Sequence, residues 1–462
     1  MATTYFTRTT GTSTDNKKFT FSSWVKRDNI SSSHTIFGVD TDSSNYIFLR
    51  WKSNGDLQFS SNVLGTGEIA FVTDRVFRDV SAWYHIVVAV DSTLSTASDR
   101  VKIYINGIRE TSFSTSTTPA INKAFAFLNN GTFEIGRRSY DTSNIYSGSM
   151  AMVEFVDGQQ YGPEYFGSFN SASGIWTPTG ATAISNYGTN GFKLKMDTTS
   201  PGADTSGKGN TFTASGTPTL LQGNPQNNWA TWNVLQSQYF WGAAETSFAT
   251  NGNTTLGSGT SQYGFISGTM GIGKGKWYWE TKINSETGGS QFLLGIASTM
   301  PRSATNHLGG NQYDYGMYSQ NGNIYTSNAS SSFAASYTVG DILSIAIDYD
   351  NAKLYFAKNG AWSTGSGAWG SSTFNAATGA KTITTPPPKP TATPGVGTGF
   401  YFPAFSYWDG SNRGFISTNF GEGFFGTTAA GTNADDNGQG LFAYDVPSGY
   451  YALNTKNLEA YG

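Results

Sequence analysis

The chain of 462 residues contains no cysteine. Neither a disulfide framework nor a thiolate metal site can therefore support the fold, and packing has to stabilise each domain. Charged residues are scarce as well, at 13% of the sequence, and 28 basic residues against 31 acidic ones leave a net charge of -3. Because no basic stripe is available to neutralise a series of phosphates, we expect no nucleic-acid partner.

Long hydrophobic runs are also absent. A membrane-spanning helix needs roughly 18 consecutive apolar residues, and no segment approaches that length. Residues 1–8 lack the apolar core of a signal peptide. We therefore expect synthesis in a cytoplasm, without a signal peptide and without membrane insertion. Apolar residues at helical spacing are missing too, so helix should be scarce.

Aromatic residues and glycine are abundant instead, at 15% and 56 residues. Short alternating apolar runs are separated by Ser, Thr, Asn and Gly, a pattern typical of strands joined by turns. The length is sufficient for two to four domains, each with a sizeable core. The composition therefore predicts an all-β protein.

One pattern occurs twice, in residues 83–107 and 343–360: an apolar strand ending in Asp, a short turn, an alternating strand, then Asn-Gly. Asn-Gly supplies the two positive-φ residues of a type I′ hairpin turn. Alternation in residues 101–105 puts the apolar side chains on one face of the strand. Each copy predicts a hairpin at the centre of a β-sandwich, so the chain should carry two related sandwiches.

The fold class that we predict is all-β, with two antiparallel jelly-roll sandwiches joined by an ordered, loop-rich bridge. The first sandwich is expected at residues 1–167 and the second at 237–425, with a tail at 426–462 that ends in a closing strand. Residues 168–236, rich in Gly, Ser and Thr, form the bridge. We expect it to pack on both domains because large aromatic side chains recur in it, namely Trp176, Phe192, Phe212, Trp229 and Trp232.

The order of the motifs resembles two known families. Residues 19–26, 83–91, 101–107 and 148–155 resemble a laminin-G or pentraxin type member of the concanavalin A-like lectin/glucanase superfamily. Residues 275–280, 294–297, 340–348, 354–360, 401–405 and 419–421 resemble a SPRY domain. Both resemblances imply a jelly-roll sandwich of two sheets.

The bridge and the tail carry a narrower resemblance. Residues 174–178, 187–192, 204–212 and 447–458 are similar to segments of structural proteins of tailed bacteriophages, especially those of marine hosts. This similarity implies a virion protein that is assembled in the host cytoplasm. The partners it implies are other virion proteins and further copies of this chain.

The glucanase resemblance requires a search for paired carboxyl groups. Glu280 and Glu286 share a strand face but would be about 20 Å apart, whereas glycoside hydrolysis needs about 5.5 to 9.5 Å. Glu154 and Asp157, three residues apart, face opposite sides of a strand. We therefore expect no enzyme. A glucanase-type hydrolase with a pair from separate strands stays an alternative, as does an architectural virion protein without a ligand.

Metal sites have weak candidates. His85 alternates with the apolar residues of its strand, so we expect it to face solvent or a polar neighbour, and the other histidines are only His34 and His307. With no cysteine, zinc is not expected. Asp40, Asp42 and Asn45 offer oxygen ligands, and the laminin-G and pentraxin resemblance implies calcium at a sandwich edge. An Asx-rich turn is the other interpretation of this loop; no other cofactor is expected.

Aromatic residues beside polar ones in loops point to carbohydrate. Sugars stack their apolar faces on aromatic rings, while amide, carboxylate and hydroxyl groups bond the sugar hydroxyls. The candidate ligand-binding residues are Trp408, Asp409, Asn412, Arg413, Trp362, Trp369, Tyr313 and Tyr315. We predict a non-enzymatic, surface-exposed structural protein of a tailed-phage virion, a tail fibre, tail tip or capsid decoration, that binds host surface polysaccharide.

Overall fold

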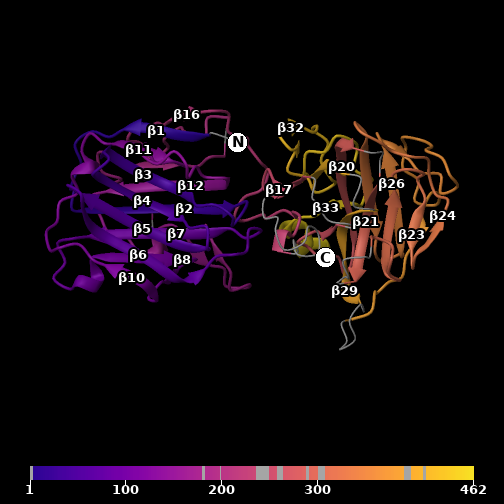
Figure 1. Cartoon of the computed structure of the whole chain (residues 1–462), viewed down its shortest axis with the longest axis horizontal. Helices are drawn as coiled ribbons and strands as arrows, with labels where there is room; N and C mark the ends of the chain where they lie inside the picture. The colour runs from indigo at the N-terminus through magenta and orange to yellow at the C-terminus, as the bar shows by residue number, and fades with distance from the viewer. Residues whose placement is uncertain are drawn as a thin grey trace. The chain divides into compact units, whose positions relative to one another are not determined.

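The computed structural model describes residues 4–178, 183–197, 199–235, 249–257, 264–287, 291–299, 307–389, 397–408 and 413–462. The chain forms two compact units, here called the N-terminal unit (residues 1–220) and the C-terminal unit (residues 221–462). Figure 1 colours the first from indigo to magenta and the second from magenta to yellow. Among the described helices, none is long and apolar enough to cross a membrane.

The N-terminal unit is a sandwich of two antiparallel sheets (Figure 1). The eight-stranded sheet has the order β10 (Phe113–Thr117), β6 (Thr66–Val76), β5 (Asp56–Val63), β4 (Asn45–Trp51), β3 (His34–Asp42), β11 (Thr132–Ile135), β1 (Tyr5–Thr9) and β16 (Thr213–Ser215). The six-stranded sheet has the order β15 (Phe192–Leu194), β12 (Gly148–Asp157), β2 (Lys18–Arg27), β7 (Tyr84–Asp91), β8 (Val101–Ile105) and β9 (Ile108–Arg109).

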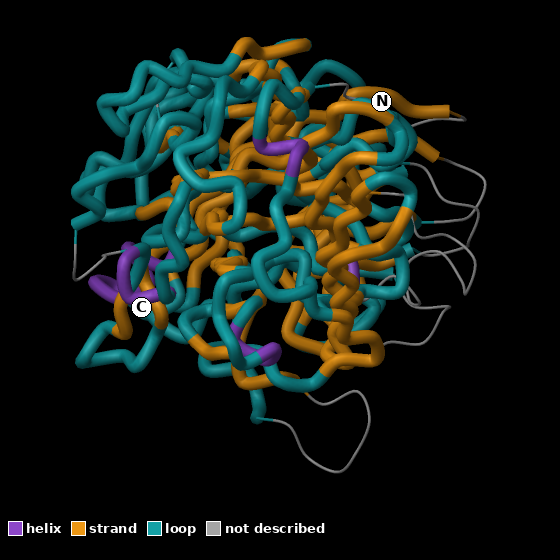
Figure 2. The backbone as a smooth tube through the Cα atoms, turned by 90° about the vertical axis from the view of Figure 1, so that its left-hand side faces the viewer, coloured by secondary structure: helices purple, strands orange, loops and turns teal. Residues whose placement is uncertain are grey.

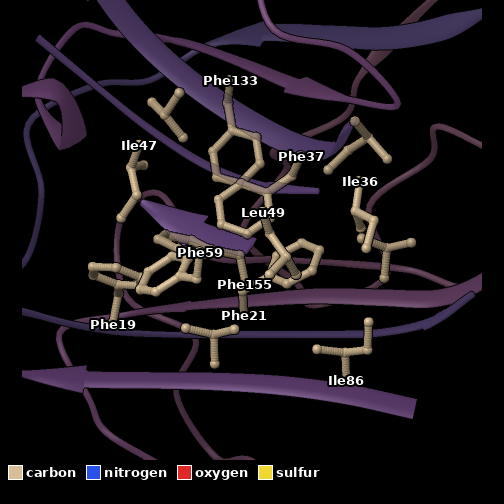
Figure 3. Packing of buried hydrophobic residues seen from close by; sticks show 14 of the residues in the cluster. Phe19, Phe21, Ile36, Phe37, Ile47, Leu49, Phe59, Ile86, Phe133 and Phe155 are labelled. Carbon is tan, nitrogen blue, oxygen red and sulfur yellow. The ribbon is translucent and has the colours of Figure 1, made fainter. Parts of the chain in front are cut away.

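The core of this unit lies between the two sheets and is rich in phenylalanine. Alternation along β2 sends Phe19 and Phe21 inward, and Phe21 stacks on Phe37 of β3 with ring centroids 4.1 Å apart. Figure 3 shows these rings gathered with Phe155 of β12, the strand beside β2, and with Phe133 of β11, the strand beside β3. The period of two in the sequence thus builds the packed interior.

The C-terminal unit is a second sandwich. Its larger sheet has the order β17 (Ala249–Thr250), β18 (Thr255–Leu256), β30 (Arg413–Asn419), β20 (Lys276–Thr287), β25 (Ile342–Asp348), β26 (Lys353–Lys358) and β27 (Ala361–Trp362), with β28 (Lys381–Thr382) on β26 and β33 (Tyr451–Ala452) parallel to β20. The six-stranded sheet has the order β19 (Phe265–Ser267), β29 (Gly397–Tyr407), β21 (Phe292–Thr299), β22 (Asp314–Tyr318), β23 (Ile324–Thr326) and β24 (Ala329–Ser331).

Helix is scarce, as predicted, and Figure 2 shows strands and loops with only short helices. The described helices are η1 (Ala97–Asp99), η2 (Ala126–Leu128), η3 (Pro163–Tyr165) and α1 (Thr455–Tyr461). Asn454 caps α1, since its side chain accepts a hydrogen bond from the backbone of Asn457. Two small ribbons, β13 (Ser168–Phe169) with β14 (Trp176–Thr177) and β31 (Phe424–Phe425) with β32 (Thr428–Ala429), complete the elements. The predicted all-β fold with two antiparallel sandwiches is confirmed.

The expected bridge is divided between the two units. Residues up to 220 belong to the N-terminal unit, where β15 pairs with β12 and β16 pairs with β1. From residue 221 the chain belongs to the C-terminal unit, and Trp232 is buried in the core of that unit. The aromatic residues of this region are thus divided between the two units, with Phe192 and Phe212 in the core of the first and Trp232 in the core of the second. In the tail, the described closing strand β33 has two residues, and α1 follows it.

Both copies of the repeated hairpin have the predicted turn. Asn106 and Gly107 have φ of 49° and 78°, and Asn359 and Gly360 have φ of 49° and 84°. In each copy the asparagine side chain accepts a hydrogen bond of 2.8 Å from the backbone of the first strand. The first strand of each copy lies inside its sheet, with β7 between β2 and β8 and β25 between β20 and β26. The second strand lies toward an edge, because among the described strands only β9 follows β8 and only β27 and β28 pair with β26 on its other side. The short strand that leaves each turn forms that edge.

A substitution in the Asn106-Gly107 turn should reveal how closely Trp176 packs on that turn. An added Cβ at Gly107 would lie 2.4 Å from the Trp176 ring, whereas Gly65, with a φ of +79°, has nothing within 4 Å. Gly65→Ala should cost about 1 kcal/mol for the left-handed backbone. Gly107→Ala should cost about 3 kcal/mol, because overpacking adds to the strain. Urea unfolding of both variants checks this, and equal losses would contradict the contact.

Candidate functional site

The predicted aromatic residues lie in separate places of the C-terminal unit. Trp408 follows β29 and packs on His307, Tyr325 and Tyr318, with ring centroids 4.3, 4.9 and 5.0 Å away. It is half-buried in this cluster. Asp409 and Asn412 lie outside the described residues, as does the side chain of Arg413, so of this predicted group the structure describes only Trp408.

The two tyrosines differ from the loop residues that we expected. Tyr315 lies within β22 and is 5% exposed, because its ring packs in the core and its hydroxyl accepts a 3.0 Å hydrogen bond from the Thr384 backbone. Its prediction as a loop residue is therefore wrong. Tyr313 lies in the turn before β22 and is half-buried.

Trp369 and Trp362 come from the segment after the second hairpin. Trp369 is half-buried, and its indole donates a 3.4 Å hydrogen bond to the Ser336 carbonyl while the Lys358 ammonium lies 5.8 Å from the ring centroid. Trp362, in β27, is 9% exposed. Of the predicted residues, Trp362 is the one that the structure places in the wall of a described cavity.

This cavity, here called the Trp362 pocket, has a volume of about 490 Å³, within the range of ligand sites. Alternation along β26 directs Leu354 and Phe356 into the core and leaves Tyr355 on the outer face of the sheet. The next strand adds Trp362, and residues 363–379 close the rim. The lining residues are Tyr355, Trp362, Ser363, Thr364, Gly370, Ser371, Thr373, Phe374, Asn375, Thr378 and Gly379.

Three aromatic rings form the apolar wall of the Trp362 pocket. Phe374 is half-buried and meets Trp362 and Tyr355 edge to face, at centroid distances of 4.8 and 5.0 Å. The Tyr355 hydroxyl donates a 2.8 Å hydrogen bond to the Ala376 carbonyl. Burial, with Asp348 adding to it, raises the pKa of Tyr355 and keeps the hydroxyl neutral. The wall is therefore uncharged.

The rim of the Trp362 pocket presents polar groups that the described part of the chain does not use. The hydroxyls of Thr373 and Thr378 form no hydrogen bond with the described residues, and both side chains are exposed. The Asn375 side-chain oxygen accepts a 2.9 Å bond from the Ala377 backbone, and the side-chain NH2 forms no hydrogen bond with the described residues. A hydroxyl-rich ligand could therefore exchange water for these groups. Sequence reasoning missed Phe374 and this rim, although the run of Ser, Thr and Asn after the Asn-Gly turn was a signal.

A second cavity, of about 450 Å³, lies on the outer face of the six-stranded sheet in the N-terminal unit. Glu154 of β12 forms a 3.0 Å ion pair with Lys193 and accepts a 2.5 Å hydrogen bond from the Tyr187 hydroxyl. Residues 178 and 183 also line this cavity, and the residues between them are outside the described ranges. Because of its contacts with Lys193 and Tyr187, Glu154 is part of a structural ion pair.

The other carboxyl groups that we considered have structural partners as well. Glu280 is fully buried and accepts hydrogen bonds from the backbone of Ala443 and Tyr444, both at 2.9 Å, and from the Tyr278 hydroxyl at 2.8 Å. Burial raises the pKa of Glu280 to about 7. The strand pairing shifts between Ile283 and Ser285, so the alternation that put Glu280 and Glu286 on one face is interrupted.

His85 is buried, and its predicted exposure to solvent is wrong. The indole of Trp176 donates a 2.9 Å hydrogen bond to Nδ1, so Nε2 carries the proton and donates to the Ser22 hydroxyl at 2.9 Å. The ring also stacks on Trp24 at 4.9 Å. Burial lowers the pKa of His85 to about 3, so the imidazole is neutral. The polar-neighbour interpretation applies here, under a covering segment that the strand pattern does not reveal.

The predicted calcium ligands form the β3–β4 hairpin. Asp40 is buried and pairs with Arg138 at 3.1 Å, and burial, partly offset by Arg138, raises its pKa to about 6. Asp42 accepts a 2.7 Å bond from the Ser44 backbone, and Asn45 accepts a 2.9 Å bond from the Leu64 backbone. The Asp42 contact matches the Asx-turn interpretation, while Asp40 and Asn45 have partners outside the hairpin. Among the described residues, no group of three or more acidic or histidine side chains could hold a metal ion.

Comparison with known protein families agrees with the order of the two units. Residues 2–159 match the model of the concanavalin A-like lectin/glucanases superfamily, and residues 276–381 match the model of the SPRY domain. The chain carries a concanavalin A-like domain followed by a SPRY domain. The Trp362 pocket lies within the SPRY match, while the Glu154 cavity borders the concanavalin A-like domain. The chain has no significant match among curated protein sequences.

Similar solved structures include a SPRY domain, a pentraxin and a carbohydrate-binding protein. The SPRY domain of human HERC1 is 19% identical, and the match covers 36% of this chain and 87% of that one, with a TM-score of 0.26. The pentraxin of Limulus polyphemus is 15% identical over 34% and 78%, with a TM-score of 0.25. A putative carbohydrate-binding protein of Bacteroides ovatus is 15% identical over 47% and 61%, with a TM-score of 0.28.

Proposed function

We propose that the chain is a non-enzymatic carbohydrate-binding protein and that the Trp362 pocket is its ligand site. The observation that carries this proposal is an aromatic wall of Tyr355, Trp362 and Phe374 beside unused hydroxyl and amide groups on one rim. A sugar ring has an apolar face for such a wall and hydroxyls for such a rim. The lectin/glucanase superfamily match of residues 2–159 is consistent with carbohydrate as the ligand of the protein.

The absence of catalysis is part of this proposal. Glu280 lies under the tail with its oxygens accepting backbone hydrogen bonds, and Glu154 is ion-paired to Lys193. The Asp157 carboxylate accepts from the backbone of Thr14 and Asn190. A general acid or a nucleophile needs a carboxyl oxygen that is free to act on the scissile bond, whereas the oxygens of these three groups are held by protein partners. Release of reducing ends from a polysaccharide, abolished by one carboxylate substitution, would instead identify a hydrolase.

We expect Phe374→Ala to weaken glycan binding strongly while Trp408→Ala retains it. Phe374 is half-buried in the wall of the proposed site, so its removal takes away one ring on which a sugar can stack. Trp408 belongs to the separate cluster with His307. Loss of one stacked ring should weaken affinity by about tenfold or more. A glycan array with the full chain checks this, and circular dichroism confirms folding of both variants.

The reverse result would contradict the assignment of the site. If Trp408→Ala abolishes binding and Phe374→Ala does not, the His307–Trp408 cluster is the site and the Trp362 pocket is not. If no glycan binds at all while the protein is still incorporated into a particle, the architectural alternative is correct.

The proposed biological setting is the surface of a tailed-phage particle, as tail fibre, tail tip or capsid decoration. Its support is the similarity of residues 174–178, 187–192, 204–212 and 447–458 to such proteins. Mass spectrometry of purified particles should find several copies of the chain, and antibodies should label intact particles. A chain that is absent from particles, or hidden within them, would contradict this setting.

Assembly with further copies or with other virion proteins belongs to the same proposal. β10 pairs only with β6 among the described strands and leaves residues 114–117 exposed at the edge of its sheet. Such an edge presents unpaired backbone groups that another chain can cover. Light scattering of the purified chain measures the oligomeric state.

A further inference from the structure

We infer that the Trp362 pocket selects uncharged saccharides over acidic ones, an inference that rests on the function proposed above. None of the residues that line the pocket is charged; the polar ones are Ser363, Thr364, Ser371, Thr373, Asn375 and Thr378, with the Tyr355 hydroxyl. A carboxylate or sulfate would leave water here without a cation to receive it. Such uncompensated burial of a charge is costly.

The aromatic wall also disfavours an anion. The face of an aromatic ring carries negative electrostatic potential, so it attracts the C–H groups of a sugar and repels a carboxylate. Phe374 meets both other rings edge to face, with interplanar angles of 70°. Its own exposed surface is therefore the part of the wall that a sugar ring can cover.

Two basic side chains close to the aromatic wall and the rim, Lys353 and Lys276, are outside the lining and have partners of their own. Lys353 donates a 2.9 Å hydrogen bond to the Ala376 carbonyl, next to Asn375 of the rim. Lys276 forms a 3.1 Å ion pair with Asp348, and its ammonium lies 5.6 Å from the centroid of the Tyr450 ring. Among the described residues, Lys353 is a cation hydrogen-bonded next to the rim from which an acidic ligand would gain, and it therefore provides a test of the inference.

The rim groups match the chemistry of a neutral sugar. Each threonine hydroxyl can donate and accept, as a sugar hydroxyl can, and the Asn375 amide has two donors. Thr373 and Thr378 lie on the exposed loop of residues 371–379, so removing either hydroxyl leaves the core unchanged. Thr378→Val keeps the shape of the side chain and removes only the hydrogen bonds.

The experiment compares pairs of oligosaccharides that differ only in a carboxylate or sulfate group, titrated against the full chain by calorimetry at two salt concentrations. We expect the neutral member of each pair to bind at least about tenfold more tightly. Thr378→Val should weaken that binding about fivefold, the equivalent of one lost hydrogen bond. Lys353→Gln should leave it unchanged.

Two results would overturn the inference, and they are distinguishable. Acidic members that bind as tightly as neutral ones, with affinity lost in Lys353→Gln, would mean that the pocket is an anion site while carbohydrate binding itself stands. If neither member binds, or if binding is unaffected by Phe374→Ala, the proposed function fails together with the inference.

Discussion

Raising the pH from 4.5 through 7 should destabilise the C-terminal unit by about 3 kcal/mol through Glu280 alone. Burial raises the pKa of this carboxyl from 4.5 to about 7. Between these values the folded chain holds a proton that the unfolded chain has released. Stability is therefore fully present below pH 4.5 and is lost as the pH rises through 7.

Glu280→Gln should remove this pH dependence, because the amide has a similar shape and does not ionise. Urea unfolding at pH 5, 6, 7 and 8 measures the difference in unfolding free energy between the variant and the original chain. The difference should move in favour of the variant as the pH rises. Glu286→Gln, on the same strand but half-buried, is the matched control. Parallel curves for Glu280→Gln and the original chain would contradict the pKa of Glu280.

Acidification should destabilise the N-terminal unit, the opposite response. Burial lowers the pKa of His85 from 6.5 to about 3. Between these values the imidazole is protonated in the unfolded chain and neutral in the folded chain. Stability is present above 6.5 and is lost as the pH falls toward 3. The loss from His85 should reach about 2 kcal/mol at pH 5. His34, whose pKa burial and then Arg27 lower to about 4, should respond in the same direction.

His85→Gln separates the proton effect from the packing effect. The variant loses the stack on Trp24 at every pH, so its overall stability is lower, but it gains no charge in acid. Between pH 7.5 and 5 the original chain should lose about 2 kcal/mol more than the variant. Hydrogen exchange of the intact protein can assign this loss to peptides of the N-terminal unit. An unchanged slope in the variant would show that His85 is not the group that titrates.

The two responses share a structural origin. In each unit the repeated hairpin lies in a sheet whose outer face is covered by a later segment of the chain. Trp176 covers His85 and contacts the turn glycine Gly107, and the tail covers Glu280 while Tyr444 lies over Gly360, where a Cβ would be 2.9 Å from the ring. Each covering segment encloses a titratable group, and the two groups have opposite charge when ionised.

Much of the fold followed from local patterns. Alternation in residues 101–105 and 353–358 places the core side chains, and Asn-Gly defines both turns, because these features depend only on neighbours within a few residues. The candidate site was predicted only through Trp362. Its partner Phe374 and the polar rim come from an irregular loop, where no period links position to direction.

Residue type and spacing were sufficient to specify two antiparallel sandwiches with an Asn-Gly hairpin in each, since side-chain period and turn chemistry act locally. The burial of His85 and Glu280, the division of the expected bridge and the formation of the Trp362 pocket depend on long-range packing. Trp176 is 91 residues from His85, and Ala443 is 163 residues from Glu280. Contacts across such separations leave no local pattern, so they become visible only when the chain is folded.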